Sequence, residues 1–409
     1  CMAGVMVDEA PILLFDEPLA NLDPATGKLV IELIDEINKT QKKTIIIIEH
    51  RLEDVLHRPV DRIVLVNNGE ILADCKPEEL FATTLLEDNG IRLPLYVQAM
   101  KYAGVDLSKV KNLADDADYD LMDQKDKLVH WYNTNKADVH AKQSAPLLTV
   151  KDLCFSYDGV KPILDHVCFD VHQGEMISVV GKNGAGKSTL CKCICAFEKA
   201  DSGVLTFENT DMADLSVKER ADRIGFVLQN PNQMICNTMI FDEVAMGLRN
   251  RGVTEEKIKE KVENTLKICG LYPFRNWPIS ALSYGQKKRV TIASILALEP
   301  KMIILDEPTA GQDYRRYSEI MEFLKSLNEM GIAIVMITHD MHLMLEYTTR
   351  SVVLTGGQKI ADATPSEVLG NEALIGRANL KKTSLSTLAA KAGIEDRIAF
   401  IDTFIQHER

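Results

Sequence analysis

The chain has 409 residues and a formal net charge of −13, and hydrophobic residues make up 46% of it. This length favours two domains over one, and the acidic balance argues against a nucleic-acid binder, which would carry a basic face. No apolar stretch reaches the roughly 18 residues of a membrane-spanning helix, and no secretory signal is expected at the start. Nine cysteines, an odd number, indicate reduced thiols in a cytosolic protein.

The first predicted elements are two apolar strands. ILLFDE at residues 12–17 ends in Asp16 and Glu17, and IIIIEH at residues 45–50 ends in His50. Carboxylates at a strand end serve phosphate chemistry only beside a loop that holds phosphates. No such loop precedes residue 12, so we interpret this segment as part of an ATPase that lacks its phosphate-binding loop.

The same strings recur later in the chain, with a register that drifts by two residues. Such self-similarity indicates an internal repeat. We interpret the chain as a tandem duplication whose first copy is cut short, a truncated product or a fragment. The matching pairs of segments are 12–23 with 302–313, 45–51 with 334–340, and 64–80 with 352–368, with a fainter match of 94–106 with 383–396.

The segment between the copies, roughly residues 107–146, is polar. Residues 106–127 hold seven Asp and four Lys, with Tyr119 as the one aromatic residue. A metal-binding acidic cluster is one interpretation, and a solvated linker is the other. Charge runs of this kind usually form solvated segments, which favours the linker.

The string MISVVGKNGAGKSTL at residues 176–190 has the pattern of a phosphate-binding loop between a buried strand and a helix. Glycines let backbone N–H groups close on an anion, and the helix N-terminus adds partial positive charge. Lys187 is expected to reach the β and γ phosphates, and the Ser188 hydroxyl to hold Mg²⁺. The predicted nucleotide-binding residues here are Gly181, Lys182, Asn183, Gly184, Ala185, Gly186, Lys187, Ser188 and Thr189.

Two further motifs follow. Gln229 ends a predicted strand, where a glutamine can contact both Mg²⁺ and the attacking water. Ser283, Gly285 and Gln286 stand at a predicted helix start, where free backbone N–H groups form a second anion site. An ordinary strand-end glutamine and a simple N-cap are the alternatives, and the order of the motifs favours the functional interpretation.

The last motifs are the buried strand MIILDE and a later strand that ends at His339. Asp306 is expected to bind Mg²⁺, and Glu307 to polarise the attacking water. A carboxylate pair at a strand end is sometimes a capping accident, and a lone histidine is more often structural. Here His339 is placed to contact the γ-phosphate and to orient Glu307.

These residues, in this order, resemble the ATP-binding cassette (ABC) ATPases. The resemblance implies an α/β fold: phosphate-loop NTPase cassettes with an antiparallel β subdomain and a helical subdomain. It assigns residues 181–189 to the Walker A loop, Gln229 to the Q-loop and Leu282–Gln286 to the signature. It further assigns Asp306 and Glu307 to Walker B, Asp313 to the D-loop, His339 to the switch and Tyr157 to stacking on adenine, with Asp16, Glu17, Asp23 and His50 as first-copy counterparts.

Within that family the chain looks most like the duplicated energy-coupling factor ATPases. QNPNQM at residues 229–234 resembles the region that touches their membrane subunit. This likeness implies ATP and Mg²⁺ as cofactors, separate transmembrane coupling and substrate-binding subunits as partners, and a peripheral place at the cytoplasmic membrane face. The expected function is to power uptake of a vitamin, a thiamine precursor or a metal ion. The expected parts are residues 1–80 (a first-cassette remnant), 81–146 (a helical segment and polar linker), 147–370 (a complete cassette) and 371–409 (a helical tail).

In this family each ATP lies between the Walker A loop of one cassette and the signature of another. The chain is therefore expected not to complete a site within itself, so it would need a homodimer or a partner cassette. Changing Glu17 or His50 is expected to alter turnover little, and an apolar surface is expected to be exposed at residues 45–48. The alternatives are a soluble tandem ABC protein outside transport, which the acidic linker disfavours, and a nucleotide-binding fragment that does not hydrolyse ATP.

Overall fold

The computed structural model describes residues 10–19, 22–136, 145–309 and 314–408. Its centre is a six-stranded sheet in the order β10-β11-β12-β7-β13-β14, parallel except for β14. Strands β7 and β12 are buried along their whole length, which is typical of a parallel sheet covered on both faces. The strands span β7 (Met176–Val180), β10 (Ile224–Val227), β11 (Met302–Asp306), β12 (Ala333–Ile337), β13 (Arg350–Thr355) and β14 (Gln358–Ala363).

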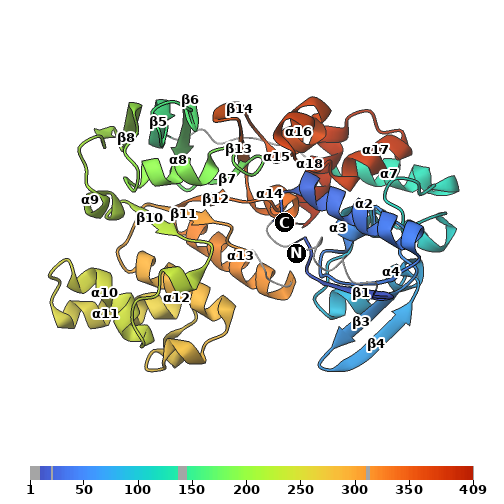
Figure 1. Cartoon of the computed structure of the whole chain (residues 1–409), viewed down its shortest axis with the longest axis horizontal. Coiled ribbons are helices and arrows are strands. Elements are labelled where there is room, and N and C mark those ends of the chain that lie inside the picture. The colour runs from blue at the N-terminus through green and yellow to red at the C-terminus, as the bar shows by residue number, and fades with distance from the viewer. Residues whose placement is uncertain (1–9, 20–21, 137–144, 310–313, 409) are drawn as a thin grey trace.

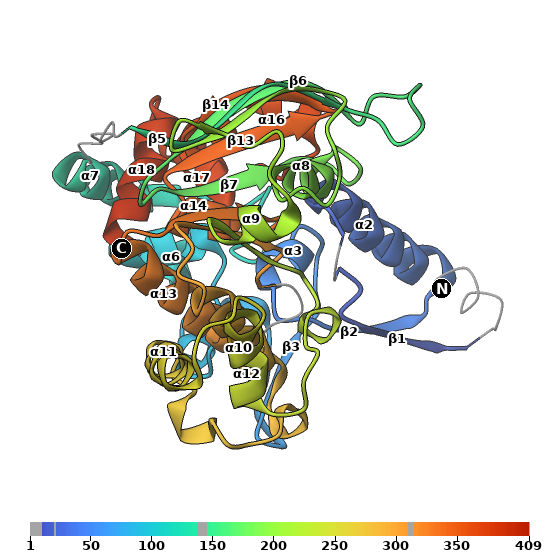
Figure 2. The ribbon, with the colours of Figure 1, turned by 90° about the vertical axis from the view of Figure 1, so that its left-hand side faces the viewer.

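The antiparallel β subdomain and the helical subdomain that the family resemblance implies are both present, and they lie on opposite sides of this sheet (Figure 2). One is the antiparallel sheet β6-β5-β8-β9; the other is the helical group α10–α12. The strands of the antiparallel sheet are β5 (Pro146–Phe155), β6 (Leu164–His172), β8 (Ser202–Phe207) and β9 (Thr210–Asp211). The helices of the helical group are α10 (Ile240–Arg249), α11 (Glu255–Ile268) and α12 (Tyr284–Leu296). The other helices of the second copy up to β13 are α8 (Lys187–Ile194), α9 (Val217–Ala221), α13 (Tyr314–Glu329) and α14 (Met341–Tyr347).

The first copy repeats the local geometry of the second. Strand β1 (Ile12–Asp16) pairs in parallel with β2 (Thr44–Ile48), as β11 pairs with β12. Glu17 and Glu307 both have positive φ, 43° and 45°, and both donate their backbone N–H to the end of the neighbouring strand. The repeat found in the sequence is therefore also present in the structure, down to the positive φ at these two glutamates. The other elements of this copy are α2 (Pro24–Gln41), α3 (Leu52–Val55), β3 (Ile63–Asn67) and β4 (Glu70–Cys75).

One face of the β1–β2 ribbon is covered and the other is open. Helix α2 packs Ile31 and Ile34 against the covered face, where Ile45 and Ile47 contact them. On the open face Leu14 is 64% exposed, and Ile46 and Ile48 are about half exposed. An exposed apolar surface was expected over residues 45–48; it is found at the alternate positions that face away from α2.

The expectation of a solvated linker over residues 107–146 is wrong for the described part of that segment. Leu113, Tyr119 and Leu121 are almost fully buried, in one core with the C-terminal helices. The Lys391 ammonium donates to the Tyr119 carbonyl at 2.8 Å. Most of the acidic residues are exposed, although Asp115 and Asp116 are half-buried, while the apolar residues interspersed among them pack inward. The elements here are η1 (Leu107–Lys109), η2 (Met122–Gln124) and α7 (Lys125–Asn135).

The two copies meet through their tails. Helix α6 (Leu95–Tyr102) contacts α17 (Ser384–Ala392), its counterpart in the repeat, and the first copy lies beside the C-terminal helices (Figure 1). Among the described residues, no helix is both long and apolar enough to cross a bilayer. The remaining elements are α4 (Pro77–Phe81), α5 (Leu85–Asp88), α15 (Pro365–Gly370), α16 (Glu372–Ala378) and α18 (Arg397–Glu408), with the short helices η3 (Pro231–Gln233), η4 (Tyr272–Phe274) and η5 (Ile279–Ala281).

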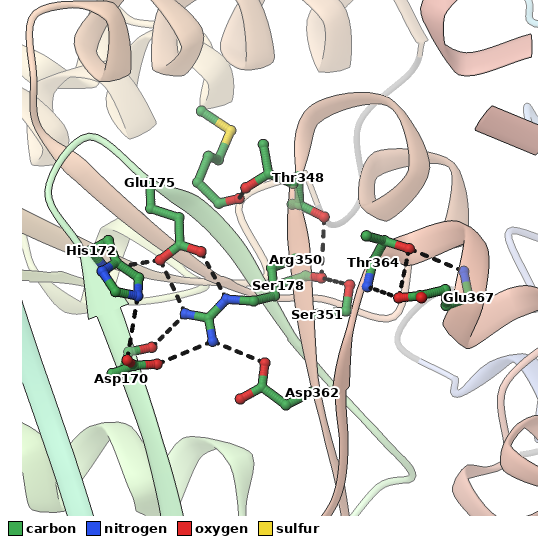
Figure 3. Close-up of polar contacts among 12 residues, drawn as sticks. Asp170, His172, Glu175, Ser178, Thr348, Arg350, Ser351, Asp362, Thr364 and Glu367 are labelled. Atoms are coloured by element: carbon green, nitrogen blue, oxygen red, sulfur yellow. Dashed lines mark hydrogen bonds and ion pairs between the residues drawn. The ribbon is translucent and has the colours of Figure 1, made fainter. Parts of the chain in front are cut away.

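Arg350 joins the two sheets of the second copy (Figure 3). Its guanidinium donates to Glu175 at 2.8 Å, to Asp362 at 2.9 Å and to Asp170 at 3.2 Å. These carboxylates belong to the turn before β7, to β14 and to β6. A planar guanidinium can bind several carboxylates in fixed directions, so one side chain holds three elements in register.

Replacing Arg350 by Met keeps the apolar stem but leaves three carboxylates facing one another. We expect the free energy of unfolding in urea to fall by about 2 kcal/mol or more. The matched control is Arg62→Met, since the Arg62–Asp74 pair is exposed and such pairs contribute less than about 1 kcal/mol. Equal losses in the two variants would contradict the role assigned to Arg350.

Candidate functional site

The loop between β7 and α8 has the closed shape that its glycines allow. Gly181 and Gly186 have φ of 144° and 98°, and a Cβ on Gly181 would lie 2.0 Å from the Leu354 carbonyl oxygen. The Lys187 ammonium donates to the carbonyl oxygens of Gly181, at 2.8 Å, and Lys182, at 3.1 Å. The loop thus closes around its own lysine, and burial lowers the pKa of that ammonium.

Ser188 and Asp306 meet beside this loop. The Ser188 hydroxyl donates to the Asp306 carboxylate at 3.2 Å, and burial raises the pKa of Asp306. A hydroxyl and a carboxylate are oxygen donors, the class that Mg²⁺ prefers. The donor pair therefore fits the Mg²⁺ site expected at these two residues.

Glu307 and His339 form the second pair. His339 Nε2 lies 3.4 Å from Glu307 Oε1, and both side chains are less than one-fifth exposed. Burial, with the Asp306 charge as a lesser cause, raises the pKa of Glu307 to about 8. Burial and the Lys187 charge lower the pKa of His339 to about 4. The carboxyl group is thus poised to exchange a proton near neutral pH, beside a neutral imidazole.

Gln229 is held by two residues of α12: Tyr284, which belongs to the predicted signature, and Lys288, which the sequence analysis did not single out. The Gln229 backbone carbonyl oxygen accepts from the Lys288 ammonium at 2.8 Å and from the Tyr284 hydroxyl at 3.2 Å. Lys288 is buried, and its pKa falls to about 8 through desolvation. Tyr284 lies within the predicted signature and Lys288 lies just after it, but Gln229 is more than 50 residues away from both, so no local pattern indicates the contact.

Most of the predicted nucleotide-site residues line one cavity of about 370 Å³, whose opposite wall comes from the first copy, while Gly181 and Lys182 lie outside its lining. Its second-copy lining includes residues 183–189, Gln229, Asp306, Glu307 and His339, and its first-copy lining includes Glu17, Glu49, His50 and Arg51. His50 Nδ1 lies 3.7 Å from Glu17 Oε1, which repeats the Glu307–His339 pair. The sequence analysis left Glu17 and His50 without a phosphate loop; the structure instead brings them to the loop of the second copy.

Polar contacts between the copies hold them in this placement. Lys381, from the segment before α17, donates to the Asp54 carboxylate at 2.9 Å, and His342 of α14 lies 3.6 Å from Glu53. Arg92 pairs with Glu346 of α14. All three contacts join residues more than 250 positions apart, so the sequence pattern did not indicate them.

Three groups of predicted residues lie elsewhere. Ser283 and Gln286 cap each other at the start of α12, beside Gly285, and none of the three lines this cavity. Tyr157 is 58% exposed and also lies outside it. Asp313 falls outside the described residues. Its first-copy counterpart, Asp23, caps α2, and its charge acts on Lys187 and His339.

Glu307→Gln tests the electrostatics of the site. Because the pKa of Glu307 is higher in the folded chain than its ordinary 4.5, the folded state holds a proton that the unfolded state releases, so stability falls as pH rises from about 4.5 through about 8. The free energy of unfolding of the variant, measured in urea without nucleotide, should rise relative to the parent by about 4 kcal/mol between about pH 5 and about pH 8.5. The exposed Glu395→Gln should show no such gain; a pH-independent difference at Glu307 would refute the raised pKa.

Three family models match parts of the chain. The model described as "ABC transporter" matches residues 164–310, and the one described as "ATP-binding cassette cobalt transporter" matches residues 83–155. A third, of an AAA domain, matches residues 275–346. A structure of cbiO1 from Clostridium perfringens, described as part of the ABC transporter complex cbiONQ, is 33% identical, with a TM-score of 0.54 over 60% of this chain and 100% of that one.

Two relatives match this chain over its whole length. A protein of C. perfringens named "Putative ABC transporter ATP-binding protein" is 56% identical over 100% of this chain and 72% of its own length. One of the same description from Enterococcus faecalis is 54% identical, again over 100% of this chain and 72% of its length. The chain belongs to the ABC transporter ATP-binding proteins, the ATPase subunits of ABC transporters.

Proposed function

We propose that this chain binds ATP with Mg²⁺ in the cavity between its two copies and hydrolyses it to drive a nutrient importer. The observation that carries the proposal is the Glu307–His339 pair, 3.4 Å apart, in the same cavity as the phosphate loop. A carboxyl group with a pKa of about 8 beside a neutral imidazole suits activation of water next to a bound phosphate.

The chain's own residues divide the work. Lys187 exchanges its two carbonyl partners for phosphate oxygens, while residues 181–189 offer backbone N–H groups to the same oxygens. Ser188 and Asp306 hold Mg²⁺, which when bound neutralises charge on the phosphates. Glu307 then takes a proton from the attacking water, and His339 contacts the γ-phosphate. Gln229 contacts both the metal ion and the attacking water.

A second anion site completes the arrangement. Ser283, Gly285 and Gln286 stand at the N-terminus of α12 and do not reach this cavity. We propose that they face the nucleotide of another cassette, in a homodimer or with a partner cassette. Tyr157 is available to stack on adenine, since its ring is more than half exposed.

The transport role rests on the kinship with ABC transporter subunits. We propose that separate transmembrane coupling and substrate-binding proteins hold this chain at the cytoplasmic membrane face, with residues 229–234 in the contact. Three residues of that segment, Asn230, Asn232 and Gln233, are exposed. Among a vitamin, a thiamine precursor and a metal ion, the description "cobalt transporter" of the model that matches residues 83–155 favours the metal ion.

The catalytic assignment is tested by two variants. Lys187→Ala should weaken ATP binding by about tenfold or more, because the phosphates lose their cation. Glu307→Gln should keep ATP affinity within about threefold and lower turnover by about 10²-fold or more. Equilibrium ATP binding and phosphate release, measured against chain concentration, give both quantities.

The matched control is Glu395→Gln, the same change at an exposed glutamate that does not line the cavity. Its turnover should change less than about twofold, because the side chain lies outside the proposed site. Parental turnover in Glu307→Gln would refute the catalytic assignment, and unchanged ATP affinity in Lys187→Ala would refute the phosphate loop.

A further inference from the structure

A cluster of metal-ligand side chains lies away from the nucleotide cavity, on the strand pair β5–β6. Cys154 on β5 and Asp165 and His166 on β6 each offer one ligand atom, and these atoms all lie within 4.8 Å of one another. Cys154 and Asp165 are half-buried and His166 is exposed. None of the three lines the nucleotide cavity, so its chemistry does not account for them.

The backbone explains why these side chains converge. Neighbouring residues of a regular strand point to opposite faces, so Asp165 and His166 would normally separate. Here the β5–β6 register shifts on both sides of Leu153, and His166 has a φ of 50°. The His166 backbone N–H donates to the Cys154 sulfur at 3.3 Å. The irregular pairing thus turns two adjacent residues of β6 toward one thiol of β5.

Two of the three ligands, Asp165 and His166, also have supporting contacts. Gln358 of β14 donates to one oxygen of Asp165 at 2.6 Å, while the other oxygen lies 4.0 Å from His166 Nε2. On the far side of the ring, Nδ1 lies 3.7 Å from the Asp152 carboxylate. A carboxylate behind a histidine is the usual second-shell partner of a metal-bound imidazole, which it orients and makes more basic.

We propose that Cys154, Asp165 and His166 bind one divalent transition-metal ion of the borderline class, such as Zn²⁺ or Co²⁺. Thiolate and imidazole together select such ions over Mg²⁺ and Ca²⁺, which prefer oxygen donors. Three protein ligands with exposure at His166 leave a fourth position for water. The ion would join β5 to β6 on either side of the loop 156–163 that carries Tyr157. If metal binding also changed ATP affinity, that effect would depend on the function proposed above. The metal binding itself does not depend on it.

Co²⁺ alone is the probe, because thiolate ligation produces a charge-transfer absorption band. The full chain, fully reduced and free of nucleotide, is titrated with Co²⁺. We expect the band to saturate at one ion per chain and to be displaced by Zn²⁺. Cys154→Ser should abolish it, His166→Ala should remove saturable binding, and the near-isosteric Asp165→Asn should weaken binding by at least about tenfold.

The matched control is Cys168→Ser, on the same strand pair. The Cys168 sulfur accepts from the Asp152 backbone N–H at 3.1 Å and stands outside the three-residue cluster, so its loss should keep the band. Cys236→Ser controls for an exposed thiol elsewhere. Absence of a band in the parent, or a band that survives Cys154→Ser and disappears in Cys168→Ser, would overturn the proposal. Neither result would bear on ATP hydrolysis, which is measured separately.

Discussion

The closure of the phosphate loop around the Lys187 ammonium is the constraint on which the rest of the site depends. The loop leaves the carboxyl end of β7, and Asp306 and Glu307 leave the carboxyl end of β11, two positions away in the same parallel sheet. Parallel strands bring these ends to one edge, where open α/β sheets bind ligands. The sheet therefore sets a cation and two carboxylates close together before any nucleotide arrives, and burial shifts the pKa of each of them.

The first copy contributes a wall to this site. Its Glu17–His50 pair repeats the strand-end geometry of Glu307–His339, but it is more exposed and faces the loop of the other copy. Packing of α6 on α17 and the Lys381–Asp54 ion pair hold the two copies together. An element duplicated in the sequence has thus become part of a composite surface in which the two copies play different roles.

Much of the fold and half of the site were predictable from sequence. The phosphate loop and the strand ends at Asp306 and His339 are local patterns, each recognised within a short stretch of sequence, and the repeat follows from direct comparison of two parts of the same sequence. The first-copy wall, the hold of Lys288 on Gln229 and the burial of Tyr119 all depend on contacts between distant segments. The Cys154 cluster depends on register shifts between β5 and β6 that the amino-acid sequence does not indicate. The linker was misjudged because charge density concealed its regularly placed apolar residues.

The composite wall is tested most directly by hydrogen–deuterium exchange of the full chain, with and without Mg²⁺ and a non-hydrolysable ATP analogue. If one nucleotide lies between the copies, backbone amides of residues 181–189 and of residues 48–54 should both exchange more slowly when it is bound. Protection of residues 181–189 with unchanged exchange at residues 48–54 would contradict a site shared by the two copies, and would leave the phosphate loop as a one-sided nucleotide site.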